Sequence, residues 1–163
     1  MHRSGKTLII GGLLLVIWGM SYGLWYAVFD EHQTLVRMGE RLTTAFAKAA
    51  ARDLPAANAA LDEYAAAKFE YVREVDVHSH WSGLAVLLVV LGLMFEQVRF
   101  DERTRQRLAR TLVLASFLFP LGVILQTISH GPATRGLAAV AAGLLILSLA
   151  AVAIGFARAR EKT

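Results

Sequence analysis

Four long stretches without a single charged side chain constrain the fold of this chain more than any other feature. They are residues 7–29, 77–95, 111–129 and 136–157. Each is close to the roughly 20 apolar residues that a helix needs to cross a hydrocarbon layer about 30 Å thick. Only 18% of the residues are charged, whereas soluble domains average about 25%. The sequence therefore predicts an all-α integral membrane protein, a four-transmembrane-helix bundle in which residues 1–163 form a single membrane domain.

Basic residues are distributed unequally around these stretches. Residues 30–76 contain six Lys or Arg against nine Asp or Glu, and residues 130–135 add only one arginine. The other ten of the 17 basic residues lie at the opposite ends of the stretches: Arg3, Lys6, Arg99, Arg103, Arg105, Arg107, Arg110, Arg158, Arg160 and Lys162. Because short basic loops remain in the cytoplasm, we predict a bacterial inner-membrane protein with both termini and the loop 96–110 cytoplasmic. Since these arginines flank spans, we expect them to contact anionic lipid and not nucleic acid.

The segment 30–76 is too long for a structureless loop and has a helical pattern. Apolar residues recur at spacings of three and four in each half: Leu35, Met38, Leu42, Ala45, then Leu54, Ala57, Leu61, Tyr64. Between the halves, Asp53 is suited to cap a second helix whose first turn accommodates Pro55. We predict a periplasmic helical hairpin between the first two spans. Alanine buries little area, so we expect its partner surface to be a second copy or another membrane subunit.

The predicted topology brings four of the five histidines to the outer end of the spans: His32, His78, His80 and His130. Imidazole is a common ligand of copper, zinc and haem iron. In a regular helix His78 and His80 point about 200° apart, so two arrangements are open. In one, His80 and His130 hold a haem iron while His78 points elsewhere. In the other, an irregular segment at 78–80 binds one copper or zinc ion with His130 or His32.

Two further polar residues belong to this candidate site. Glu74 precedes His78 by one helical turn and is a candidate metal ligand with the histidines, and Gln126 lies about one turn inside the third span, where it is a candidate contact for a cofactor or quinone. The alternative is that these residues bind no ligand. Histidines are common at membrane interfaces, and a glutamine can form a hydrogen bond between two helices. The absence of cysteine excludes thiolate metal sites and disulfides.

Two functions follow from these features. The first is electron transfer by a small membrane protein that carries b-type haem, or else copper or zinc, and reacts with quinol or a periplasmic redox partner. The stretch His78–Gly83 resembles the His-x-His openings of spans in haem–copper-oxidase-like proteins and in small uncharacterised bacterial membrane proteins. The second is a cofactor-free accessory, structural or assembly subunit of a larger respiratory or photosynthetic complex. We identify no catalytic residues and expect no enzymatic activity from the isolated chain.

Overall fold

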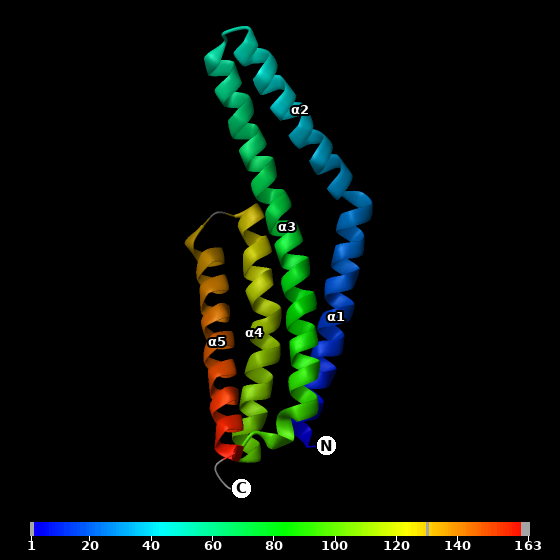
Figure 1. The fold of residues 1–163 in the computed structure, drawn as a ribbon, viewed down its shortest axis with the longest axis vertical. Helices are drawn as coiled ribbons and strands as arrows, with labels where there is room; N and C mark the ends of the chain where they lie inside the picture. The colour runs from blue at the N-terminus through cyan, green and yellow to red at the C-terminus, as the bar shows by residue number, and fades with distance from the viewer. Residues whose placement is uncertain (1, 130, 161–163) are drawn as a thin grey trace. The chain divides into compact units, whose positions relative to one another are not determined.

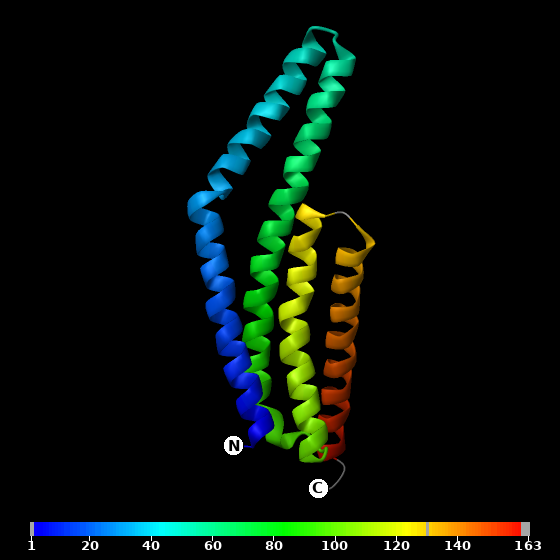
Figure 2. The same ribbon diagram turned by 180° about the vertical axis from the view of Figure 1, so that it is seen from behind.

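Helices make up all the regular secondary structure in the part of the chain that the structure describes. The computed structural model describes residues 2–129 and 131–160. Its elements are α1 (Arg3–Phe29), α2 (Glu31–Ala50), α3 (Leu54–Met94), the short 3₁₀ helix η1 (Phe95–Gln97), α4 (Glu102–Ile128) and α5 (Pro132–Arg160) (Figures 1 and 2). By length and composition, α1, α3, α4 and α5 could each cross a membrane. The predictions of an all-helical chain and four long apolar helices are confirmed.

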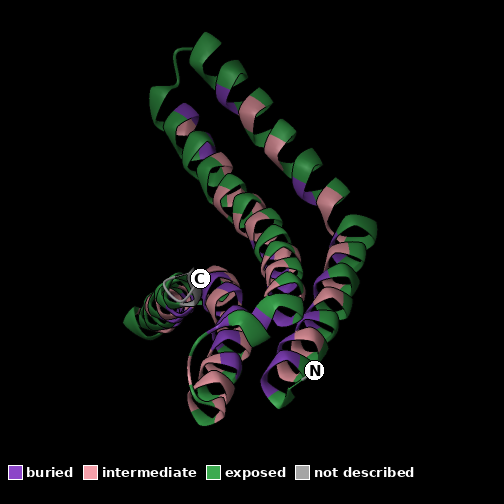
Figure 3. Ribbon diagram, turned by 60° about the horizontal axis from the view of Figure 1, so that its bottom comes forward, coloured by how far each residue is buried: buried purple, intermediate pink, exposed green. Residues whose placement is uncertain are grey.

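The chain divides into two compact units. The larger unit contains Met1–Met20 and Val77–Thr163, and the smaller unit contains Ser21–Asp76. The division falls within α1 and within α3, so each of these helices contributes to both units. In Figure 3 buried residues alternate with exposed ones along the helices, which is expected when only part of each helix surface faces a neighbour.

Glycines set the helix spacing in the larger unit. A Cβ atom on Gly12 would lie 2.8 Å from the carbonyl oxygen of Ala85, and one on Gly122 would lie 2.6 Å from the backbone nitrogen of Ala138. Both distances are shorter than any ordinary Cβ contact. The α1–α3 and α4–α5 pairs therefore approach closely because these positions have no side chain.

Aromatic side chains of α1, α3 and α4 pack around the buried Trp81. Trp81 is 1% exposed, and the centroid of its ring lies 5.8 Å from that of Trp18 and 6.2 Å from that of Phe117. The Trp81 Nε1–H donates to the carbonyl oxygen of Phe117 at 3.2 Å. Pro120 is buried one turn further along α4 and has no N–H to donate to Ser116. The indole thus binds the backbone of α4 next to the carbonyl that the proline leaves unpaired.

A tight turn joins α2 to α3 in the smaller unit. The N–H of Arg52 donates to the Ala49 carbonyl at 2.9 Å, and that of Asp53 donates to the Lys48 carbonyl at 3.0 Å. These two bonds make up a Schellman motif, with Arg52 at φ 60° where glycine is usual. Asp53 Oδ1 accepts from the N–H of Ala56 at 3.2 Å, which confirms the predicted cap.

The helices run further than the apolar stretches do. α3 is one continuous helix through residues 78–80, so the irregular segment expected in the copper or zinc arrangement is not formed. Its i→i+4 backbone bonds continue across these residues because no proline or glycine interrupts them before Gly83. α4 begins at Glu102, well before the predicted span, because Asp101 caps it.

Candidate histidine site

His78 is the best-defined of the predicted ligands. The ring is half-buried, and its Nδ1 lies 2.9 Å from the carbonyl oxygen of Gly19 on α1. A carbonyl oxygen only accepts, so Nδ1 carries the proton in this contact. The lone pair of a neutral ring is then on Nε2. Histidines that ligate metals commonly donate their other ring nitrogen to a backbone carbonyl in this way, which fixes both the tautomer and the ring orientation.

The close approach of α1 and α3 makes this contact possible. A Cβ on Gly19 would meet the Cβ of Trp81 at 3.0 Å, so a larger residue would push α1 away from α3. The Gly19 carbonyl comes within reach of the His78 ring because the helices are this near. A single glycine therefore both packs against Trp81 and orients His78.

His80 lies in a different environment. Its side chain is exposed. Its ring forms a T-shaped contact with the ring of Phe119 on α4, with 5.1 Å between the centroids and an interplanar angle of 87°. His78 thus contacts the backbone of α1, whereas His80 contacts a ring of α4. This agrees with the 200° separation expected in a regular helix. The rings of His78 and His80 therefore do not point toward one shared ion.

The remaining predicted residues are dispersed. His32 is exposed on α2, and Glu74 on α3 has a buried Oε2 with no hydrogen-bond partner within the described residues; both belong to the smaller unit. Gln126 donates from Nε2 to the carbonyl oxygen of Gly122 at 3.1 Å, a bond within its own helix. His130 lies outside the described residues.

The described part of the chain has no cluster of three or more His, Asp or Glu residues with the spacing of a metal site. A zinc or copper ion bound by protein alone generally requires three or four such ligands. Haem iron requires only one or two. In His78 the contact of Nδ1 with the Gly19 carbonyl leaves Nε2 as the nitrogen that carries the lone pair.

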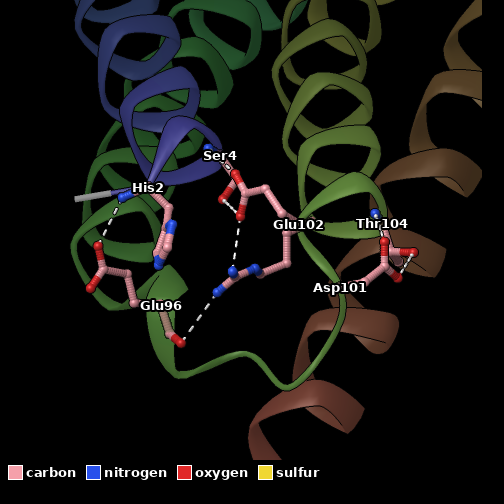
Figure 4. A network of polar contacts seen from close by, with 7 residues as sticks. His2, Ser4, Glu96, Asp101, Glu102 and Thr104 are labelled. Atoms are coloured by element: carbon pink, nitrogen blue, oxygen red, sulfur yellow. Dashed lines mark hydrogen bonds and ion pairs between the residues drawn. The ribbon is translucent and has the colours of Figure 1, made fainter.

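A second polar region, which the sequence did not reveal, lies where α1 and α4 begin (Figure 4). Glu102 accepts from the N–H of Ser4 at 3.1 Å and forms an ion pair with Arg105 at 2.9 Å. Asp101 accepts from the N–H and the hydroxyl of Thr104, and these bonds hold the pKa of its carboxyl below the ordinary value. The sequence signal was an Asp-x-x-Thr cap, hidden within a run of arginines.

These features define a class of protein: an all-helical chain with four long apolar helices and an oriented histidine between two of them. No family model matches the chain. Neither a curated protein nor a solved structure gives a significant match.

Proposed function

We propose that this chain is a multi-pass protein of the bacterial inner membrane. The support is the exposure of large apolar side chains on the long helices, such as Leu147 at 69% and Ile146 at 67% on α5 and Leu24 at 67% on α1. Continuous apolar surface of this kind is unfavourable in water and suits a hydrocarbon layer. Both termini lie in the cytoplasm, according to the positive-inside rule, and residues 30–76 form an extramembrane hairpin in the periplasm.

The absence of native cysteine permits a direct test of this topology. Ala47→Cys on α2 and Gln97→Cys at the last residue of η1 place single thiols at exposed positions on opposite sides of the proposed membrane. In intact cells with a permeabilised outer membrane, we expect a membrane-impermeant maleimide to label only Ala47→Cys. Labelling of Gln97→Cys alone would invert the topology, and equal labelling of both would contradict a spanning arrangement.

The histidine site is the basis of the proposed activity, which is electron transfer through a b-type haem. The observation that carries it is the 2.9 Å contact between His78 Nδ1 and the Gly19 carbonyl, because it leaves the ligating lone pair on Nε2. His80, His130 and Gln126 are the further candidate residues that would hold the haem. When bound, the haem would supply the one-electron chemistry, and His78 would be oriented for it by the Gly19 carbonyl. Quinol or a periplasmic protein is the proposed electron donor or acceptor.

A reduced-minus-oxidised absorption spectrum with elemental analysis tests the cofactor. We expect near-stoichiometric iron and a Soret band that His78→Ala removes or shifts. The matched control is His2→Ala, at the opposite end of the helices, which should leave the spectrum unchanged. Copper or zinc at one ion per chain, without haem, would replace the haem proposal with the metal one. A colourless protein free of iron, copper and zinc would exclude both.

The second candidate function is that of a cofactor-free accessory or assembly subunit of a larger respiratory or photosynthetic complex. Exposed apolar side chains on the charged helices of the smaller unit support it, for example Phe46 at 68%, Leu61 at 44% and Leu35 at 44%. These residues lie outside the uncharged stretches, so lipid does not account for them. The partner would be another membrane subunit or a second copy of the chain.

The subunit candidate predicts an assembly heavier than the 17.8 kDa chain in mild detergent. Mass photometry or light scattering with detergent correction would measure it, and mass spectrometry of the purified material would separate a self-assembly from a complex with other chains. Phe46→Ser should weaken the assembly, and Lys48→Ser, a polar neighbour on the same helix, should not. A stable monomer that binds haem would favour the electron-transfer proposal alone.

A further inference from the structure

Four arginines line one groove where α1 and α4 begin. The groove has a volume of about 320 Å³, and its lining residues come from both helices: Arg3, Glu102, Arg103, Gln106, Arg107 and Arg110. Residues 103, 107 and 110 are four and three apart, so their side chains share one face of α4. Arg3 reaches the same groove from α1. Guanidinium groups from two helices thus converge on one small volume.

The charge in this groove is not neutralised by the protein. Glu102 is the one carboxylate in the lining, and it already accepts from the Ser4 N–H and from Arg105. Within the described residues, Arg3, Arg103, Arg107 and Arg110 form no ion pair. Like charges this close repel one another, and the repulsion is relieved when an anion binds.

Gln106 lines the groove together with the arginines. Its Nε2 donates to the hydroxyl of Thr7 at 2.9 Å, which fixes the orientation of the amide. Its Oε1 is buried and has no hydrogen-bond partner within the described residues. A buried carbonyl oxygen without a donor costs free energy. Gln106 is therefore a fixed part of the lining, and a bound ligand meets the arginines and not this oxygen.

We infer that this groove binds the phosphodiester headgroup of an anionic glycerophospholipid such as phosphatidylglycerol. Guanidinium groups match phosphate oxygens with paired hydrogen bonds. The groove lies at the end of α1 and α4 that is proposed to face the cytoplasm, which is where anionic headgroups would meet it. The inference goes beyond the proposed electron transfer, and it does not depend on the histidine site.

Calorimetric titration of the detergent-solubilised protein with a soluble short-chain lipid tests the site. The probes are dihexanoylphosphatidylglycerol, dihexanoylphosphatidylcholine and inorganic phosphate. We expect saturable binding of the phosphatidylglycerol, and weak or no binding of the zwitterionic lipid. Arg107→Gln should weaken that binding by about tenfold or more, because it removes a charge-assisted hydrogen bond.

Arg99→Gln is the matched control. Arg99 is exposed at the same end of the protein but does not line the groove, so this variant removes the same charge and leaves the site intact. Circular dichroism of each variant confirms that the helices are retained.

The outcomes separate the sources of the phosphate group. If inorganic phosphate binds as tightly as the lipid and Arg107→Gln abolishes both, the groove is a site for free phosphate and the lipid assignment is wrong. If Arg99→Gln weakens binding as much as Arg107→Gln does, the attraction is a general surface effect and the site does not exist. Failure of wild-type protein to bind phosphatidylglycerol would also overturn the inference.

Discussion

The larger and smaller units bury different kinds of side chain. In the larger unit the buried residues include bulky ones: Trp81, Phe95, Leu88 and Leu112. In the smaller unit they are mostly small: Thr34, Ala45, Ala57 and Ala60, together with Tyr26. Buried area is the main favourable contribution to packing. The smaller unit therefore obtains less stability from interior contacts than the larger unit does, and its exposed ion pairs, such as Arg41–Glu63 at 2.8 Å, add little.

Substitution of Trp81 should have the largest effect on the free energy of unfolding. Trp81→Ala removes a side chain that contacts Trp18 and Phe117 and donates to α4, so we expect the free energy of unfolding to fall by about 3–5 kcal/mol. Unfolding with sodium dodecyl sulfate, followed by circular dichroism, measures it. Trp25→Ala, at a residue 51% exposed in the smaller unit, should change the value by about 0.5 kcal/mol or less. Equal losses in the two variants would remove the distinction between the units.

Glycine substitutions sharpen the same comparison within the larger unit. Gly122→Ala would place a Cβ against the backbone of Ala138, so α4 and α5 must separate, and we expect a loss of about 1–3 kcal/mol in the same unfolding assay. At Gly143 on α5 an added Cβ would have no neighbour within 4 Å. Gly143→Ala should therefore raise the free energy of unfolding by up to about 1 kcal/mol, because alanine is the better helix former. A loss at both positions would mean that α5 packs by another face.

In the smaller unit a stabilising change is available at the turn. Arg52 has φ 60°, a conformation that is strained for a residue with a Cβ. Arg52→Gly should raise the free energy of unfolding by about 1 kcal/mol. The neighbouring Ala51 has an ordinary φ of −77°, so Ala51→Gly should lower it by about 0.5–1 kcal/mol. If both variants are destabilised, the strain at Arg52 does not limit the stability of this unit.

Features that depend on local chemistry could be predicted from the sequence. Long uncharged runs indicated the four apolar helices, and Asp53 with Pro55 indicated the beginning of α3. Lateral contacts between helices could not be predicted. The histidines at 78 and 80 share a depth, but their neighbours are the Gly19 carbonyl and Phe119, on different helices. The packing of Gly122 against Ala138, and the meeting of Arg3 with the arginines of α4, also depend on the rotation of each helix about its axis, which a single sequence does not determine.

The smallest expected effect concerns Asp101, which caps α4 as Asp53 caps α3. Its Oδ1 accepts from the Thr104 hydroxyl at 2.6 Å and its Oδ2 from the Thr104 N–H at 3.0 Å. These bonds, the side-chain one first, favour the charged form and lower the pKa of the carboxyl from its ordinary value of 3.8. Because the folded-state pKa is the lower one, this contribution to stability is complete above the unfolded-state pKa. It is lost as the pH falls through the folded-state pKa.

Asp101→Asn tests this contribution, because asparagine still caps a helix but does not titrate. We expect the thermal midpoint of the wild-type protein to exceed that of the variant near neutral pH, and the difference to shrink as the pH is lowered below about 4. Differential scanning fluorimetry across this range measures both proteins. A difference that stays constant down to the lowest pH would show that the carboxylate charge does not contribute to the cap. The stability of α4 at its first turn would then depend on the hydrogen bonds of the cap and not on the charge of Asp101.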